Sequence, residues 1–262
     1  LKSVNKIDKG EIMILDNFSL KGRVAIVTGS NTGLGQGICR AFVEAGALVA
    51  GVSRRPSTET AQMLGAGFHN IIADLSSSSV ADGIIAQTVN RFGRVDILVN
   101  NAGLIKRCDS LDFSEENWDS VLNVNLKTAF FLSQSAAKQF IKQCTGGKII
   151  NIASMLSYQG GVRVPSYTAS KSAIRGVTMT LANEWARYGI NVNAIAPGYM
   201  ATNNTEALRQ DEERSADILA RIPAGRWGTP ADLEGAAVFL ASEASDYVNG
   251  FTLAVDGGWL GR

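Results

Sequence analysis

Histidine, cysteine and long apolar runs are scarce in this sequence. Its 262 residues include one histidine, His69, and three cysteines, Cys39, Cys108 and Cys144. A histidine triad or metal site therefore has a single candidate, and a solvated position near a strand end is the better interpretation of His69. The odd cysteine count and the cysteine spacing match neither a metal site nor a disulfide framework. We therefore expect reduced thiols, no metal and a cytoplasmic location.

An excess of charge of either sign is also missing. Lysine and arginine number 25, aspartate and glutamate number 24, and the formal net charge is +1. Such a balance provides no field that would recruit nucleic acid or an anionic membrane. No apolar run approaches the roughly 18 residues of a membrane span, and the first residues mix lysines with acidic residues instead of forming a secretory signal. We expect neither nucleic acid nor membrane as a partner, so selectivity for an anionic ligand has to come from individual residues.

The order of the apolar runs predicts an α/β fold. Strand-like runs alternate with helical patterns, which indicates βαβ units around a parallel sheet. Several runs are continuously apolar, as expected for strands with helices on both faces. The expected strands span residues 23–28, 47–53, 68–73, 97–100, 148–153, 191–196 and 252–255. We expect a single catalytic domain over residues 18–262, after an irregular N-terminal extension, residues 1–17, of which we assign no function to residues 1–12.

A charge-rich segment, residues 202–222, lies between the last two expected strands. Its composition predicts a pair of solvated helices. The segment is also placed where a mobile lid over a ligand would lie. The two interpretations are compatible, because a lid has an outer face.

A glycine-rich turn follows the first expected strand, with the sequence TGSNTGLG from Thr28 to Gly35. A helical pattern follows it and ends at Gly46. Glycines in such a turn let backbone N–H groups approach a pyrophosphate without a Cβ in the way, and the helix N-terminus adds partial positive charge. The turn therefore predicts a dinucleotide site. Asp74 after the third strand, near the adenine, and the NNAG sequence that ends at Gly103 fit this site, although each is also a common loop-forming sequence.

Tyr167 and Lys171 carry the chemical signature. Apolar positions recur every four residues over residues 166–188, which predicts a helix that stops at Gly189 and places both side chains on one face. A tyrosine pKa of about 10 is too high for a base at neutral pH, and lowering it to about 7 takes roughly 4 kcal/mol from a nearby ammonium and a cofactor's positive ring. Tyr167 is therefore the predicted acid/base of a hydride transfer, and Ser154 is predicted to hold the substrate oxygen.

Asn125 is a further candidate. The predicted helix around it places its amide in an apolar stripe, where it needs hydrogen-bond partners. The stripe is formed by Trp118, Val121, Leu122, Leu126 and Ala129. Asn125 is either a satisfied structural residue or the organiser of a water chain to Lys171, and the presence of Tyr167 and Lys171 favours the second interpretation.

These motifs resemble the short-chain dehydrogenase/reductase family across residues 18–262. The glycine-rich turn, NNAG, the NVN around Asn125, the thirteen-residue spacing from Ser154 to Tyr167 and the turn at Pro197 and Gly198 occur in the family's order. The resemblance implies a Rossmann-type doubly wound seven-stranded parallel sheet, a tetrad of Asn125, Ser154, Tyr167 and Lys171, and a homotetramer. It also implies that Lys171 binds the nicotinamide ribose. The expected cofactor contacts are Gly29, Asn31, Thr32, Gly33, Leu34, Gly35, Ser53, Arg54, Arg55, Asp74, Leu75, Asn101, Ala102, Gly103, Tyr167, Lys171, Pro197, Gly198 and Thr202.

Longer segments, such as RIPAGRWG and SDYVNGFTLAVDGGWL, resemble family members that interconvert hydroxyl and keto groups of 3-deoxy sugar acids, in the degradation of uronates. A gluconate 5-dehydrogenase and a 3-oxoacyl-carrier-protein reductase stand as alternatives within the family. A carrier-protein reductase is expected to carry a basic docking patch, which the near-neutral charge does not support. A nucleotide-binding regulator without catalysis is a third hypothesis, and the intact tetrad argues against it.

The cofactor is expected to be NADP or NAD, and two arginines favour NADP. Arg54 and Arg55 follow the second strand, where NAD-selective relatives often carry a carboxylate for the ribose 2′-hydroxyl. A guanidinium matches a phosphate in charge and geometry. Thr32 argues in the other direction, because many NADP enzymes of the family have a basic residue there.

A sugar-acid substrate needs a partner for its carboxylate. Arg163, in the glycine-containing segment between Ser154 and Tyr167, is the first candidate, and Arg107, after the NNAG sequence, is the second. The alternative for either arginine is a bond to a neighbouring carboxylate or carbonyl. Ser154 and Tyr167 complete the expected substrate contacts.

Overall fold

The computed structural model describes residues 13–262, so the expected extension over residues 1–12 lies outside the described residues. The described chain begins with a short 3-10 helix, η1 (Ile14–Phe18). The ring centroid of Phe18 lies 6.2 Å from that of Phe239, so this segment rests on the body of the protein. The last residues of the expected irregular extension are therefore helical.

Seven parallel strands form one sheet in the order β3-β2-β1-β4-β5-β6-β7. They are β1 (Val24–Thr28), β2 (Leu48–Ser53), β3 (Phe68–Ile72), β4 (Ile97–Asn100), β5 (Gly147–Ile152), β6 (Ile190–Pro197) and β7 (Thr252–Val255). Every residue of β1, β4 and the second half of β5 is buried, which explains their continuously apolar sequences. The predicted doubly wound α/β sheet is confirmed, and the strand ends differ from the expected ones by one residue at most.

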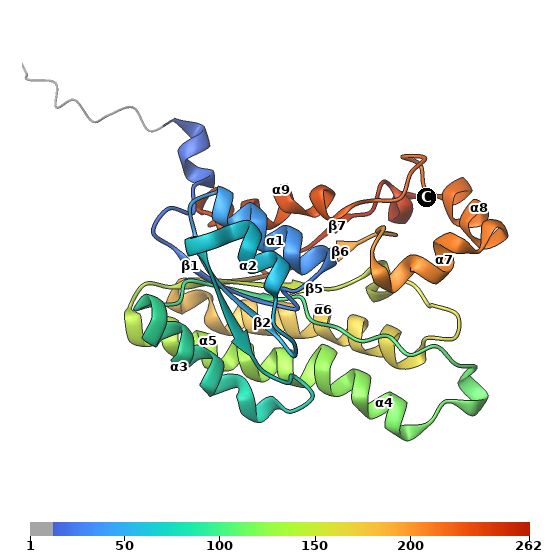
Figure 1. Ribbon diagram of the computed structural model, residues 1–262, viewed down its shortest axis with the longest axis horizontal. Helices are drawn as coiled ribbons and strands as arrows, with labels where there is room; N and C mark the ends of the chain where they lie inside the picture. The colour runs from blue at the N-terminus through green and yellow to red at the C-terminus, as the bar shows by residue number, and fades with distance from the viewer. Residues whose placement is uncertain (1–12) are drawn as a thin grey trace, which may run out of the picture.

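Helices cover both faces of this sheet (Figure 1). The α-helices are α1 (Gly33–Glu44), α2 (Thr58–Leu64), α3 (Ala81–Phe92), α4 (Glu115–Leu122), α5 (Ala129–Gln143), α6 (Pro165–Trp185), α7 (Glu206–Gln210), α8 (Glu212–Arg221) and α9 (Pro230–Ala241). Residues of α1 and α9, such as Phe42 and Leu240, build the core on one face. Residues of α3, α5 and α6, such as Ile84, Phe140 and Leu181, build the core on the other.

Helix α6 carries the chemical signature and has the predicted extent. It begins with Pro165, whose missing N–H is tolerated at a helix start. A 3-10 turn, η7 (Ala186–Tyr188), follows it, and Gly189 ends the segment with a φ of +70°. The sequence therefore positioned Tyr167 and Lys171 correctly, one turn apart on this helix.

A π-helical turn, η5 (Asn123–Thr128), joins α4 to α5. Such turns concentrate at functional sites, and this one contains Asn125. Val121 and Asn125 are buried as expected, whereas Trp118 is 38% exposed. The burial expected of Trp118 as part of the apolar stripe is therefore wrong.

The charge-rich segment forms the expected helices, α7 and α8, after a short 3-10 turn, η8 (Asn203–Thr205). Ile218 and Ile222 pack against Met155 and Trp259. The segment therefore has a solvated face and an apolar face, and it lies beyond the carboxyl ends of the strands (Figure 1).

Within residues 13–262, none of the helices is both long and apolar enough to cross a membrane. The same residues contain no group of three or more histidine, cysteine or acidic side chains arranged to hold a metal. His69 is half-buried in β3 with its ring edge-on to Phe92, and the three cysteines are free thiols. We therefore looked for a ligand site among the cavities at the edge of the sheet.

Candidate functional site

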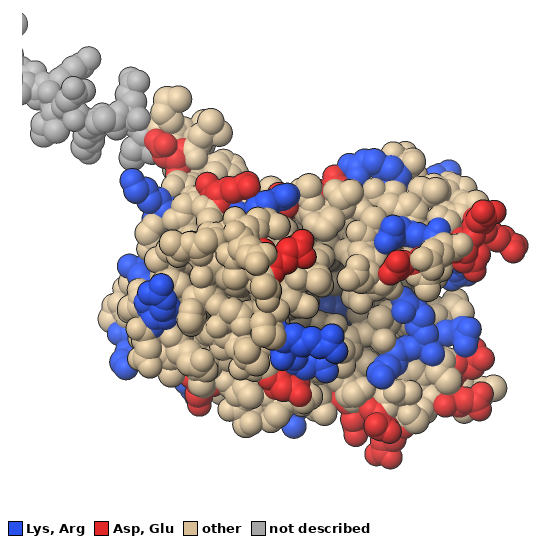
Figure 2. Space-filling model, in the orientation of Figure 1, with Lys and Arg blue, Asp and Glu red and all other residues tan. Residues whose placement is uncertain are grey.

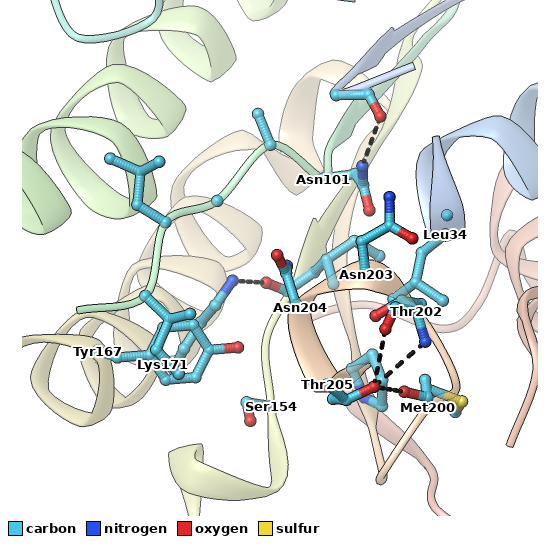
Figure 3. A pocket seen from close by; sticks show the side chains of 18 of the residues that line it. Leu34, Asn101, Ser154, Tyr167, Lys171, Met200, Thr202, Asn203, Asn204 and Thr205 are labelled. Atoms are coloured by element: carbon cyan, nitrogen blue, oxygen red, sulfur yellow. Dashed lines mark hydrogen bonds between the residues drawn. The ribbon is translucent and has the colours of Figure 1, made fainter. Parts of the chain in front are cut away.

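A cavity of about 310 Å³ opens at the carboxyl edge of the sheet (Figure 3). It lies where β1 has β2 on one side and β4 on the other, which is the switch point at which open α/β sheets bind ligands. Figure 2 shows this face hollowed, with lysine and arginine side chains on both sides of the hollow. The lining residues are Gly29, Asn31, Thr32, Gly33, Leu34, Asn101, Ala102, Gly103, Leu104, Ile105, Arg107, Ile152, Ala153, Ser154, Tyr167, Lys171, Pro197, Gly198, Met200, Thr202, Asn203, Asn204 and Thr205.

The glycine-rich turn forms one end of this cavity. Helix α1 begins at Gly33 after Thr32, whose side chain makes no cap, so the N–H groups of its first turn keep free donor capacity. Gly33 has a φ of +59°, and a Cβ there would come within 3.6 Å of Thr202, across the cavity. Gly35 lies behind the turn, where a Cβ would overlap the carbonyl oxygen of Gly29. The uncapped helix start and the lack of side chains fit a pyrophosphate, so the residues present suit a dinucleotide.

The NNAG loop is fixed to the glycine-rich turn by Thr28. Its hydroxyl accepts hydrogen bonds of 2.9 Å from the N–H groups of Asn101 and Ala102. The side-chain amide of Asn101 donates back to the carbonyl of Thr28 at 2.8 Å. The ends of β1 and β4 therefore present one continuous surface to a ligand.

Ser154, Tyr167 and Lys171 meet at the other end of the cavity (Figure 3). Ser154 follows β5 at the start of η6 (Met155–Ser157), and its hydroxyl accepts a hydrogen bond of 3.2 Å from the N–H of Leu156. Lys171 is buried and donates to the carbonyl of Ile152 at 2.5 Å. The predicted meeting of these three side chains is thus observed in the structure.

Burial governs the protonation of this group. Burial lowers the pKa of Lys171 to about 8. Burial also raises the pKa of Tyr167 above its usual value, while a hydrogen bond with Ser154 and the charge of Arg107 oppose that rise. The protein groups around Tyr167 therefore keep it a protonated phenol at neutral pH. The ammonium of Lys171 donates to the carbonyl of Ile152 and lies 5.6 Å from the centre of the Tyr167 ring, so it acts on the phenol through its charge and not through a hydrogen bond.

Asn125 has its side chain fully engaged with neighbouring groups. Its amide nitrogen donates to the carbonyl of Leu104 at 2.9 Å and to the hydroxyl of Ser170 at 3.1 Å. Its amide oxygen accepts from the N–H of Leu104 at 2.7 Å. Asn125 does not line the cavity, and its side chain holds the loop after Gly103, which fits a satisfied structural asparagine. The water chain to Lys171, which the sequence favoured, stays a prediction.

The two candidate arginines have different surroundings. Arg107 lines the cavity, and its guanidinium donates to the carbonyl of Asn204 at 3.2 Å. Arg163 does not line the cavity, and its Nε lies 3.1 Å from the carboxylate of Asp109. Arg163, the first candidate for the substrate carboxylate, is instead paired with a carboxylate of the protein. Arg107, the second candidate, faces the cavity.

The expected adenosine residues lie beyond the cavity. Arg54 and Arg55 are exposed after β2. Asp74 lies two residues past β3, and its pKa is held below the usual value, chiefly by the N–H of Ser76 and in part by the charge of Arg54. Arg54 and Asp74 are thus neighbours at the ends of adjacent strands.

Two expected cofactor residues have their side chains turned to the protein interior. The hydroxyl of Ser53 donates to the carbonyl of Arg55 at 2.6 Å and bonds to the hydroxyl of Ser57 at 2.9 Å. Leu75 is buried in the core beside α3. At either position a cofactor can therefore contact the backbone. At Ser53 it can also contact the side-chain hydroxyl, which already bonds to Arg55 and Ser57.

Several lining residues were not predicted from the sequence. They are Leu104, Ile105, Ile152, Ala153, Met200, Asn203, Asn204 and Thr205. Each lies within three positions of a predicted residue, so extending each motif by two or three positions was the available signal. The apolar members carry no chemistry that sequence patterns distinguish from core residues.

Comparisons with known proteins agree with this geometry. Residues 29–260 match a family model described as enoyl-(acyl carrier protein) reductase. The 2-dehydro-3-deoxy-D-gluconate 5-dehydrogenase of Escherichia coli (strain K12) is 62% identical over 253 residues, which cover 95% of this chain and 100% of that protein. The protein of the same name from Dickeya dadantii (strain 3937) is 61% identical over 253 residues, with the same coverage.

A solved structure has the same architecture. A candidate 2-deoxy-D-gluconate 3-dehydrogenase from Agrobacterium tumefaciens, with bound NADP, is 53% identical to this chain. The two structures align with a TM-score of 0.90, covering 94% of this chain and 99% of that one. The similarity therefore extends over the whole sheet and the cavity at its edge.

Proposed function

Because the chain belongs to the short-chain dehydrogenase/reductase family, we propose that this NAD(P)-dependent oxidoreductase is a 2-dehydro-3-deoxy-D-gluconate 5-dehydrogenase. The observation that carries the proposal is the single cavity that joins the glycine-rich turn to Ser154, Tyr167 and Lys171. Identities above 60% over 95% of the chain with two enzymes of that name support the substrate.

In the proposed oxidation, Tyr167 reacts in its phenolate form and receives the proton of the substrate hydroxyl, which makes it a neutral phenol. The C–H bond of the same carbon breaks with its electron pair, and the carbon becomes a ketone. Nicotinamide supplies the two-electron acceptor when it is bound. In the reverse direction Tyr167 donates the proton to the new hydroxyl oxygen.

Ser154 and Lys171 prepare Tyr167 for this transfer. The Ser154 hydroxyl lies at the cavity wall and holds the reacting oxygen against the phenol. Lys171, with a pKa of about 8, is largely protonated at neutral pH, so its charge favours the phenolate. We assign Asn125 a positioning role through Leu104, the residue after Gly103.

The cofactor is proposed to lie along the surface made by the glycine-rich turn and the NNAG loop. Gly33, Leu34 and the uncapped start of α1 suit the pyrophosphate. Arg54 and Arg55 are exposed beyond β2 and favour the 2′-phosphate of NADP, with Asp74 nearby. Because Arg54 also lies near Asp74, Arg55 is the less constrained partner for a phosphate.

We propose Arg107 as the partner of the substrate carboxylate. It lines the cavity with Ser154 and Tyr167, and its one hydrogen bond to protein, to Asn204, leaves further N–H groups for a ligand. A charge-assisted bond to Arg107 offsets the loss of water around the carboxylate. The segment that begins at Thr202 and contains α7 and α8 is the proposed lid over this end.

The assembly and setting of the enzyme are also proposals. We propose a homotetramer that acts in the cytoplasm in uronate degradation. Large apolar side chains that stay exposed on the single chain support self-association. They include Trp118, Phe131, Ile141, Met179 and Phe251. Light scattering on an eluting size-exclusion peak measures the mass, and a monomer at micromolar concentration would contradict the proposal.

A substrate panel tests the proposed activity. The purified protein is assayed at 340 nm with 2-dehydro-3-deoxy-D-gluconate, gluconate, and a 3-hydroxyacyl thioester, each with NAD and with NADP. We expect the highest kcat/KM for the 3-deoxy sugar acid, with oxidation at C5 identified by NMR of the product. A higher kcat/KM for gluconate or the thioester would identify one of the alternative enzymes instead.

A further inference from the structure

Arg163 lies outside the cavity but contacts the loop of Arg107 at two consecutive residues. Its backbone carbonyl accepts a hydrogen bond of 3.0 Å from the N–H of Cys108. Its Nε lies 3.1 Å from the carboxylate of Asp109. Arg163 and Asp109 are both exposed and neither lines the cavity, so these contacts act on the loop and not on a ligand.

The backbone of Arg163 is held in an unfavourable conformation. Its φ is +62°, and Cys144 is the only other non-glycine residue of the described chain with a positive φ. The Cβ of an L-residue disfavours this region, so the surrounding chain has to impose it. A Cβ at Gly161 would lie 2.6 Å from Val164, which shows how closely this segment folds on itself. Val164 is buried directly before α6, so Arg163 is anchored to the helix that carries Tyr167.

The other end of the same loop is anchored by Asn125. Both the N–H and the carbonyl of Leu104 bond to the Asn125 amide, at 2.7 and 2.9 Å. Arg107 lies between this anchor and the anchor at Cys108 and Asp109. Two fixed ends restrict the path of the Arg107 backbone, so its long side chain starts from a defined position at the cavity wall.

We propose that Arg163, through its ion pair with Asp109, is a positioning residue that holds Arg107 for the substrate carboxylate. This inference rests on the proposed function, because it takes Arg107 as the carboxylate partner. The pair tightens binding of the acid without touching the substrate. It leaves the proton transfer at Tyr167 and the cofactor site unchanged.

Two single variants separate the ion pair from the backbone. Arg163→Gly keeps the chain in a conformation that glycine adopts freely and removes the guanidinium. Asp109→Asn removes the charge on the other side. Since exposed ion pairs contribute modestly, we expect the KM for the acid to rise about 2- to 5-fold in each variant, with kcat nearly unchanged. The double variant should match the single variants, because the same contact is lost, and Arg163→Lys should restore most of the affinity.

Three comparisons show whether the effect passes through Arg107. The KM for the uncharged amide of the same acid and the KM for the cofactor should stay constant. In an Arg107→Ala background, Arg163→Gly should have no further effect on the KM for the acid. Glu243→Gln breaks a surface ion pair with Arg23 at the opposite edge of the sheet and should leave every KM unchanged.

The outcomes distinguish this inference from the proposed function. The assays use whichever hydroxy acid the wild-type enzyme oxidises best, so they do not depend on the identity of the sugar. An equal rise in KM for acid and amide, or a rise that persists without Arg107, would overturn the positioning role while leaving the activity intact. An unchanged KM for the acid in Arg107→Ala would overturn both the carboxylate partner and its positioning.

Discussion

The ammonium of Lys171 lies 5.6 Å from the centre of the Tyr167 ring. Lys171 is buried and Tyr167 is partly buried at the cavity wall, and loss of water acts on them in opposite directions: it lowers the pKa of the lysine and raises that of the tyrosine. Each shift favours the neutral form of its group. The protein groups alone therefore favour a protonated phenol at Tyr167, and the positive charge of a cofactor ring would favour the phenolate.

Lys171 should destabilise the folded protein below pH 8. Its pKa falls from 10.5 to about 8 on folding, so the folded state binds fewer protons between these values and stability rises with pH there. Below pH 8 the full penalty applies, about 3 kcal/mol, and above pH 10.5 it vanishes. We expect Lys171→Met to gain about 2 kcal/mol near pH 7, less than the full penalty because the carbonyl of Ile152 loses its donor.

Thermal unfolding at a series of pH values measures this effect. The melting temperature of Lys171→Met should exceed that of the wild type by roughly 4–8 °C at pH 7, and the difference should shrink toward pH 10. The exposed Lys138→Met serves as control and should show no such trend. A Lys171→Met protein less stable than the wild type at pH 7 would mean that the hydrogen bond to Ile152 outweighs burial.

Arg107 should discriminate the acid from its uncharged amide. Removing a charge-assisted bond loses roughly 1.5–3 kcal/mol, so Arg107→Ala should lower kcat/KM for the acid by about one to two orders of magnitude. The decrease in kcat/KM should be smaller for the amide, and that smaller decrease measures the effect of the Arg107 charge on Tyr167. Arg107→Lys keeps the positive charge but not the planar guanidinium, so its kcat/KM for the acid should lie between those of the wild type and Arg107→Ala. Equal losses on both substrates would remove Arg107 from carboxylate binding.

Arg55 should favour NADP over NAD. Loss of its guanidinium in Arg55→Ala is expected to lower kcat/KM for NADP by roughly tenfold or more, while kcat/KM for NAD serves as the internal reference and stays constant. Arg54→Ala should have a smaller effect, because Arg54 already lies near Asp74. A wild-type enzyme that strongly prefers NAD would mean that both arginines point into solvent.

Local patterns predicted the sheet and the signature helix, because each depends on neighbours in sequence. The strands are continuously apolar because both faces are covered, and α6 has a regular repeat closed by Gly189. The choice between Arg107 and Arg163 depended instead on Asp109 and Asn204, residues distant in sequence from their partners. No spacing rule indicates which arginine meets a carboxylate and which meets a cavity.

The π-helical turn at Asn125 and the pKa of Tyr167 depend on tertiary packing, which the sequence patterns do not predict. The π-helical turn around Asn125 inserts an extra residue into an otherwise regular helical pattern, and the sequence there predicts an ordinary helix. The pKa of Tyr167 depends on how deeply the ring is buried, whereas the sequence shows only the distance along the chain to Lys171. The meeting of Ser154, Tyr167 and Lys171 was therefore predictable, but the pKa of Tyr167 was not.

The single-turnover rate of Tyr167→Phe tests the central claim most directly. The enzyme is saturated with cofactor, mixed with substrate, and followed at 340 nm, with cofactor affinity measured separately by fluorescence. Tyr158→Phe, which removes a hydroxyl that donates to the carbonyl of Thr252 outside the cavity, is the matched control. We predict that Tyr167→Phe loses a factor of roughly 10²–10⁴ in rate while binding cofactor normally, and that Tyr158→Phe behaves as wild type. A Tyr167→Phe rate within about threefold of wild type would show that another group carries the proton.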